Sequence, residues 1–219
     1  MYEWLVIIIL IIYIYQIQYS AYPCEKMFID EALPHFRTGD IILFKASNNF
    51  NSIVTTSYFG HMGMIYVCDG VPMLFEANGI EHMNLKPHHN GRGVFLSPFC
   101  DRIKKYKGRC YWKPLNKEID PLIAFEFGKF IQYALKNMYY DTQVIQSGFK
   151  KLLGLERCCN GTNCGEIVFL ALIKLNLLSI EEYDVQRLNH LKYTSNITEL
   201  SNDYRYLPLI EIVDHPFAY

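Results

Sequence analysis

The chain has 219 residues, of which 51% are hydrophobic and 20% are charged, and its formal net charge is −1. This length predicts one domain, or one domain with an appendage, and the apolar content excludes a disordered chain. The balanced charge argues against a dedicated nucleic-acid binder, because such proteins carry a clear basic excess.

The first segment is apolar without interruption over residues 4–15. Extended to Tyr22, the segment would form a helix about 28 Å long, close to the thickness of a bilayer core. Glu3 stands where a signal peptide has its basic leader, and no clear cleavage site follows. We therefore expect residues 1–22 to be an uncleaved transmembrane anchor and residues 23–219 to be the folded domain. A cleaved signal or a buried N-terminal element remains the alternative.

The cysteine content indicates the redox environment of the folded body. Seven cysteines are an odd number at low density, which favours free thiols in a reducing environment. Lys26 weakly favours a cytoplasmic body by the positive-inside rule. Two glycosylation-type triplets, Asn160-Gly-Thr162 and Asn196-Ile-Thr198, leave the luminal alternative open. The side of the membrane therefore stays undecided.

The first half of the body reads as strands and loops. A short helix is expected over residues 28–33, where Pro34 ends it. Asp69-Gly70 is a dipeptide typical of two-residue hairpin turns, so the strands on either side should pair. The polar stretches 46–60 and 78–92 predict loops. The predicted strands cover residues 41–44, 61–67, 73–77, 94–96 and 109–113.

The second half is mainly helical. Asp120-Pro121 is a strong helix start, and apolar residues recur at helical spacing to about residue 139. Residues 165–175 are apolar on all sides and predict a buried helix. Further helices are expected over residues 142–153 and after the capping box at residues 179–182. With a closing strand at residues 207–213, the order of elements predicts an α+β domain.

Cys164 is the first candidate for chemistry. It follows a polar loop and opens the apolar helix, where the helix dipole and unpaired N–H groups favour a thiolate. The same N–H groups could hold an oxyanion. The alternative is that Cys164 is merely a small residue at a helix start.

His61 and Glu76 are candidates for the base and its orienting partner. A two-residue turn at Asp69-Gly70 pairs positions whose numbers sum to 139, so His61 should face Asn78 across the hairpin. Glu76 then lies on the same face as His61, one diagonal step away. A carboxylate in such an apolar run needs a partner, unless the strand ends in water there.

Four ordered motifs resemble one known group of enzymes. They are Gly39-Asp40-Ile-Ile-Leu-Phe44, Gly60-His-Met-Gly-Met-Ile-Tyr66, Phe75-Glu-Ala77 and Asn163-Cys-Gly-Glu-Ile-Val168. In this order they resemble the circularly permuted papain-fold hydrolases of the NlpC superfamily, similar to YiiX/YaeF-like proteins and their relatives in large DNA viruses. The resemblance covers roughly residues 39–174. It implies a permuted papain-like α+β fold, with a small antiparallel sheet packed against helices, to which the N-terminal hydrophobic helix is added.

The resemblance also implies roles for the candidate residues. Cys164 would be the nucleophile, His61 the base and Glu76 the orienter of a thiol hydrolase or acyltransferase that needs no cofactor. Members of the group act on cell-wall peptides, amides and lipid acyl groups, so a peptide, N-acyl or lipid substrate is expected. The long segment 46–60 and the helix pair at 120–155 depart from the group and could reshape the substrate groove.

The neighbours of Cys164 complete the expected site, and two other readings compete with it. Three residues, Asn163, Gly165 and Glu166, should contribute to substrate or oxyanion binding, with Gly165 allowing close backbone approach. A zinc site drawn from Cys158, Cys159, Cys164, His82, His88 and His89 fits no zinc spacing well, and a disulfide from Cys158 or Cys159 needs an oxidising compartment. The main alternative is a catalytically silent, membrane-anchored binding or assembly protein with the same fold.

Overall fold

The computed structural model describes residues 22–46, 58–78, 93–140, 161–179 and 194–214, together with the single positions 4, 8, 9, 12 and 181. The expected helix at 142–153, most of the predicted loops at 46–60 and 78–92, most of the N-terminal segment and half of the capping box fall outside the described residues. Within the described parts of the chain, no helix is long and apolar enough to cross a membrane.

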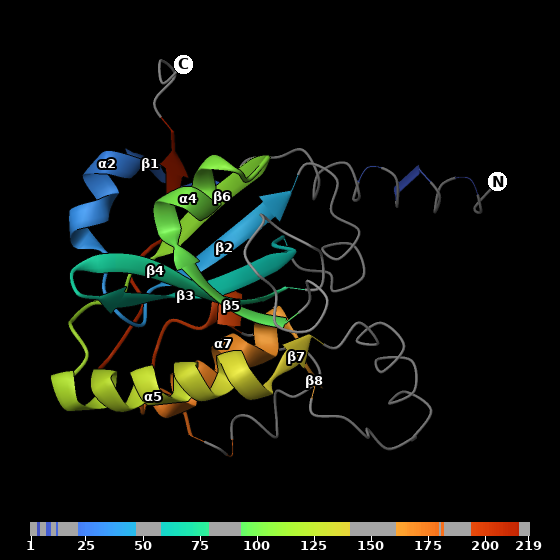
Figure 1. Ribbon diagram of the computed structural model, residues 1–219. Coiled ribbons are helices and arrows are strands. Elements are labelled where there is room, and N and C mark those ends of the chain that lie inside the picture. The colour runs from blue at the N-terminus through green and yellow to red at the C-terminus, as the bar shows by residue number, and fades with distance from the viewer. Residues whose placement is uncertain are drawn as a thin grey trace.

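The domain is built on a mixed sheet of seven strands in the order β1-β9-β6-β2-β3-β4-β5 (Figure 1). The strands are β1 (Glu25–Phe28), β2 (Ile41–Ala46), β3 (His61–Cys68), β4 (Val71–Asn78), β5 (Gly93–Pro98), β6 (Gly108–Lys113) and β9 (Ile210–Val213). The predicted α+β class is confirmed. The sheet is larger than the small antiparallel sheet that was expected, because β1 adds a parallel pairing with β9 at one edge.

Helices cover both faces of the sheet. They are α2 (Ile29–Ala32), the 3₁₀ turn η1 (Leu33–His35), α4 (Phe99–Lys104), α5 (Pro121–Asn137) and α7 (Cys164–Lys174). In Figure 1, α5 and α7 lie along one face, whereas α2 and α4 lie along the other. Each face has its own buried apolar cluster, so the fold has two cores separated by the sheet.

The β3–β4 hairpin has the predicted register. Its paired positions run from Met64↔Phe75 to Cys68↔Val71, so their numbers sum to 139 as expected. Asp69 and Gly70 have φ values of 50° and 76°, the positive values that a two-residue primed turn requires at both positions.

Gly63 allows β3 and β4 to approach each other closely. A Cβ atom at this position would lie 2.8 Å from the Leu74 side chain, 3.0 Å from the Phe75 carbonyl oxygen and 3.2 Å from Glu76 Cβ. We therefore expect Gly63→Ala to lower the free energy of unfolding by about 1–3 kcal/mol, measured by chemical denaturation. Gly70→Asn is the control, because nothing lies within 4 Å of its Cβ position and asparagine tolerates positive φ. Equal losses in the two variants would contradict this explanation.

The Gly39-Asp40 motif fixes the entry into β2. Gly39 has a φ of 100°, which favours glycine. Asp40 is fully buried and accepts hydrogen bonds from the backbone N–H groups of Arg37 and Leu115 and from Trp112 Nε1, at 2.9, 2.7 and 2.8 Å. Burial raises the pKa of Asp40 to about 7, although these donors oppose the shift. The motif therefore has a clear structural function.

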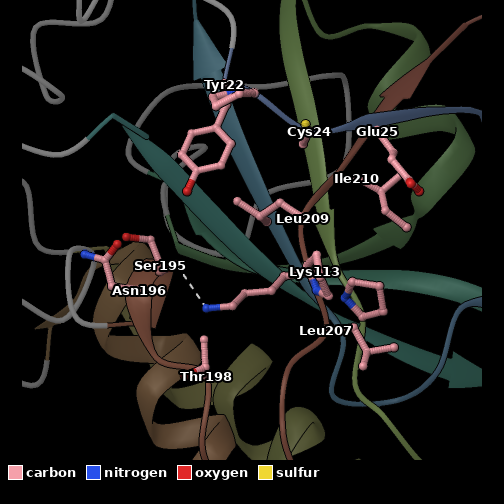
Figure 2. Close-up of a pocket in the computed structure, with 13 residues that line it drawn as sticks. Tyr22, Cys24, Glu25, Lys113, Ser195, Asn196, Thr198, Leu207, Leu209 and Ile210 are labelled. Atoms are coloured by element: carbon pink, nitrogen blue, oxygen red, sulfur yellow. Dashed lines mark hydrogen bonds between the residues drawn. The ribbon is translucent and has the colours of Figure 1, made fainter.

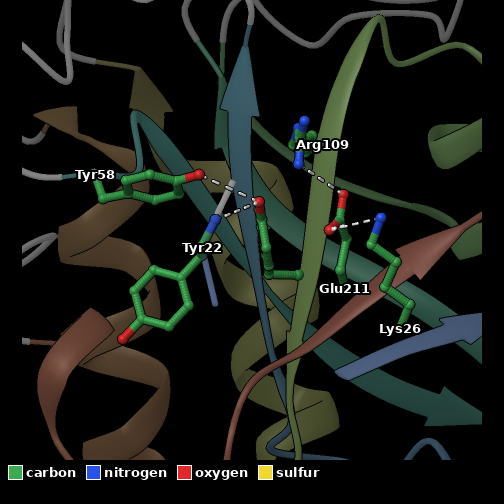
Figure 3. A network of polar contacts seen from close by, with 6 residues as sticks. Tyr22, Lys26, Tyr58, Arg109 and Glu211 are labelled. Atoms are coloured by element: carbon green, nitrogen blue, oxygen red, sulfur yellow. Dashed lines mark hydrogen bonds and ion pairs between the residues drawn. The ribbon is translucent and has the colours of Figure 1, made fainter. Parts of the chain in front are cut away.

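Polar contacts join the outer strands and the start of the described body (Figure 3). The Tyr111 hydroxyl accepts a hydrogen bond from the Tyr22 backbone N–H at 3.5 Å and lies 3.3 Å from the Tyr58 hydroxyl. On the neighbouring strand, Glu211 accepts a hydrogen bond from Arg109 at 3.4 Å. The first contact holds the segment before β1 against β6, and the second joins β6 to β9.

The two long helices begin where the sequence predicts. Asp120 caps α5 by accepting a hydrogen bond from the Leu122 N–H at 2.8 Å, and Pro121 is the first helical residue. Helix α7 is buried on nearly all sides, as its uniform apolarity predicted. Just before α7, the short strand β8 (Gly161–Thr162) pairs with β7 (Tyr139–Tyr140), which follows α5. This pairing fixes the start of α7 beside the end of α5.

The helix expected over 28–33 is present as α2, but it does not end at Pro34: it continues into η1, whose first turn tolerates proline. The closing strand is shorter than expected and begins at residue 210. Helix α4 was not predicted at all. It is a six-residue segment with no repeated apolar pattern, and its packing against the sheet defines it.

Candidate active site

His61 is the first residue of β3, a strand in the interior of the sheet. Its Nε2 atom lies 2.5 Å from Oε2 of Glu76 on the adjacent strand β4. This contact confirms that the hairpin brings the two side chains together. Their side chains are 18% and 4% exposed, respectively, so the pair is largely removed from water. The alternative in which Glu76 ends its strand in water is therefore excluded.

The charges of this pair stabilise each other. Burial by itself would raise the pKa of Glu76, but the hydrogen bond and charge of His61, followed by Arg102, lower that pKa to about 2. Burial would likewise lower the pKa of His61, but interactions with Cys164 and then with Glu76 raise it to about 9. At neutral pH the environment therefore favours an imidazolium beside a carboxylate.

Cys164 is the first residue of α7 and comes from outside the β3–β4 hairpin in sequence. Its side chain is mostly buried, with 8% of the residue exposed, and its interaction with His61 is the largest contribution that raises the pKa of that histidine. Because His61 Nε2 faces Glu76, Nδ1 is the ring nitrogen that can interact with the Cys164 sulfur. The structure thus brings together Cys164, His61 and Glu76, the three residues that the sequence singled out.

The predicted neighbours lie at the helix start. Asn163 is the N-cap of α7, and its Oδ1 accepts a hydrogen bond from the Glu166 N–H at 2.9 Å. That N–H is therefore used by the cap and is poorly placed to hold an oxyanion. The N–H groups of Cys164 and Gly165 precede it in the first turn and are not used by this cap.

Arg102 is the site residue that the sequence interpretation missed. From α4 it donates two hydrogen bonds to Glu76, Nε to Oε1 at 2.7 Å and NH2 to Oε2 at 3.4 Å. Only 3% of Arg102 is exposed. A buried carboxylate in an apolar strand did signal that a partner was needed. Nothing in the local sequence indicated that the second partner would come from a helix 26 positions away.

A separate pocket of about 580 Å³ lies between the start of the body and the 194–198 segment (Figure 2). Lys113 reaches into its wall and donates hydrogen bonds to the carbonyl oxygens of Thr194, Ser195 and Ile197. Burial lowers the pKa of Lys113 to about 7. Cys164 and His61 are not among the residues that line this pocket, so it is distinct from the candidate active site.

The alternative zinc site and disulfide involve residues that lie mostly outside the described parts of the chain. Cys158 and Cys159, with His82, His88 and His89, lie outside the described residues. Among the residues that the structure does describe, no group of three or more histidine, cysteine or acidic side chains could hold a metal ion. In the described parts of the chain, the cysteines are free thiols: Cys24, Cys68, Cys100, Cys110 and Cys164.

Comparisons with known proteins show only a distant likeness. No protein-family model matches the sequence, and no curated protein matches it. Among solved structures, the crystal structure of the metalloprotein YiiX from Escherichia coli O157:H7 is similar over 63% of this chain, with 17% sequence identity and a TM-score of 0.45. The aligned region spans about 65% of the YiiX chain. This supports a distant relation at most, and the chemistry of the site rests on its own geometry.

Proposed function

We propose that this protein is a thiol hydrolase or acyltransferase in which Cys164 is the nucleophile, His61 the general base and Glu76 the residue that orients His61. The observation that carries the proposal is the buried His61–Glu76 pair at 2.5 Å beside a cysteine at a helix start. A nucleophile, a base and an orienting group within reach of one another are what covalent acyl transfer requires.

The first half-reaction forms an acyl-enzyme. The reactive state is an ion pair in which His61 already carries the proton of the Cys164 thiol, and the imidazolium Nε2–H donates to Glu76. The thiolate attacks the substrate carbonyl carbon, and the carbonyl electron pair moves to oxygen. The first-turn N–H groups of Cys164 and Gly165 are placed to stabilise that oxyanion. When the intermediate collapses, the bond to the leaving group breaks and His61 protonates the departing amine or alcohol.

The second half-reaction releases the acyl group. His61, now neutral, takes a proton from water as the water attacks the thioester, and the thiolate leaves as the carboxylic acid forms. An alcohol or amine in place of the water would make the same site an acyltransferase.

The proposed substrates share a carbonyl that a thiolate can attack: a peptide or other amide, an N-acyl group or a lipid ester. We also propose that residues 4–22 anchor the enzyme in a membrane with the body on the cytoplasmic side. The support for the anchor is the apolar sequence itself, in which the described positions Trp4, Ile8, Ile9 and Ile12 are more than half exposed. An anchor would restrict the enzyme to substrates at or near the membrane.

The thiol chemistry can be tested before any substrate is known. We would measure the rate of iodoacetamide alkylation at each cysteine of the full chain against pH, by mass spectrometry. At pH 6 we expect Cys164 to react at least about 10-fold faster than Cys68, because the proposed ion pair with His61 supplies a reactive thiolate that Cys68 lacks. Cys68 is the internal control, since it is an exposed thiol at the opposite end of β3. His61→Ala should remove the difference.

The pH dependence of Cys164 alkylation tests the proposed ion pair with His61. Because the pKa of His61 is raised to about 9, the imidazolium persists through neutral pH and supports the thiolate until the pH passes that value. The excess reactivity of Cys164 should therefore form a plateau in the acidic and neutral range. If Cys164 reacts no faster than Cys68 in that range, the nucleophile assignment fails and the silent binding or assembly protein becomes the better explanation.

A further inference from the structure

Arg102 is the second cationic partner of Glu76, and it comes from helix α4. Its guanidinium contacts both carboxylate oxygens of Glu76, at 2.7 and 3.4 Å, while Oε2 of the same carboxylate lies 2.5 Å from His61. The Arg102 and Glu76 side chains are each 4% exposed, so this ion pair is screened little by water. Glu76 is therefore held between two cationic groups, one from β3 and one from α4.

The guanidinium is itself held in place by aromatic rings. It lies 4.9 Å from the Phe44 ring centroid and 5.4 Å from the Tyr106 ring centroid. The Phe44 ring is also 5.3 Å from the His61 ring, so one aromatic side chain contacts both the base and the arginine. Arg102 consequently has little freedom to leave Glu76, and the carboxylate has little freedom to rotate away from His61.

Among Cys164, His61, Glu76 and Arg102, the charges balance only when Arg102 is included. In the reactive state proposed above, Cys164 and Glu76 are anions and His61 is a cation, which leaves one uncompensated negative charge in a buried place. The guanidinium supplies the missing positive charge. Without it, burial would favour protonation of Glu76, and a neutral carboxyl group would give His61 less support as an imidazolium.

We propose that Arg102 is a positioning residue of the reaction: it acts through Glu76, keeping that carboxylate ionised and turned toward His61, and thereby sustains the thiolate of Cys164. The proposal rests on the proposed function of the same site. Arg102 does not touch the sulfur or the substrate carbonyl in this mechanism. Its effect on Cys164 is transmitted through Glu76 and His61 in turn.

The other titratable groups near Glu76 do not offer an equivalent charge. The Tyr106 hydroxyl and the Cys110 thiol both lie close enough to feel the carboxylate. Burial raises the pKa of each well above its ordinary value, so both stay neutral across the range in which the cysteine is assayed. A pH effect produced by changing Arg102 therefore has to pass through Glu76.

The test is the pH profile of Cys164 alkylation in the full chain, with iodoacetamide as the probe. We expect Arg102→Met to move the acidic midpoint of this profile upward by about one pH unit or more, because Glu76 then accepts a proton more readily. Arg102→Lys retains the charge and should restore part of the shift. In a Glu76→Gln background no carboxylate remains, and adding Arg102→Met should move the midpoint no further.

These variants separate positioning from a merely structural role. A structural defect would lower the rate at all pH values without moving the midpoint, and a normal midpoint in Arg102→Met would overturn the proposal. So would an equal shift in the Glu76→Gln background. Thermal unfolding reports whether Arg102→Met is folded; if it is not, Arg102→Lys and the comparison of Glu76→Gln with the double variant decide. A wild-type Cys164 no faster than Cys68 would overturn the proposed function, and this proposal with it.

Discussion

Replacing Cys164 with serine should lower acyl transfer from an activated ester by at least about 10³-fold, because the proposed mechanism has no second nucleophile. The measurement is p-nitrophenolate release from p-nitrophenyl acetate by the full chain, with the acetylated residue identified by mass spectrometry. Serine fits the space of the thiol at a helix start, so the free energy of unfolding should change by less than about 2 kcal/mol.

Cys68→Ser is the matched control for this substitution. Cys68 lies on the same strand as His61 but is exposed at its other end, so its loss should leave ester cleavage unchanged. Acetylation of Cys68 or of Cys100 at the same rate as Cys164 would show ordinary thiol chemistry rather than catalysis. Full activity in the Cys164→Ser variant would exclude Cys164 as the nucleophile.

Removing the Glu76 carboxylate should give the largest loss of stability. Glu76→Ala leaves the Arg102 guanidinium, which is 3% exposed, without its carboxylate partner. Breaking a buried ion pair by removing one member typically costs about 3–5 kcal/mol. Glu126→Ala is the matched control, because it breaks the exposed Lys129–Glu126 pair and should cost less than about 1 kcal/mol. Chemical denaturation of both variants against the wild type measures the difference.

The pH dependence of that loss has a defined sign. The lowered pKa of Glu76 contributes stability above about 4.5, the ordinary value, and this contribution is lost as the pH falls through about 2. The raised pKa of His61 contributes stability below about 6.5, which is lost as the pH rises through about 9. The difference between wild type and Glu76→Ala should therefore be greatest between about pH 4.5 and 6.5. A difference that does not vary with pH would contradict the ion-pair origin.

The sequence predicted what depends on neighbours along the chain. The His61–Glu76 contact followed from the two-residue turn and the alternation of side chains in a hairpin, which are local rules. The position of Cys164 at a helix start followed from the polar loop before it and the apolar run after it. These inferences needed no knowledge of how distant elements pack.

The parts that escaped prediction depend on packing between distant segments. Arg102 belongs to a six-residue helix whose sequence has no helical periodicity, and its role comes from docking against β4. Strand β1 has only four residues, two of them charged, and it is a strand because β9 supplies its partner. The use of the Glu166 N–H by the Asn163 cap likewise became visible only with the geometry of the helix start.

The parallel pairing of β1 with β9 has a consequence for the order in which the protein forms. It pairs Glu25 with Ile210 and Phe28 with Val213. Strand β1 is therefore synthesised long before its partner strand β9. Until then β1 has no partner, and the edge of β6 that later binds β9 is open to other chains. The β3–β4 hairpin, with its His61–Glu76 contact, can form long before Cys164 arrives. We therefore expect slow completion of folding, characteristic of long-range contacts, in which the base and its carboxylate are assembled well ahead of the nucleophile.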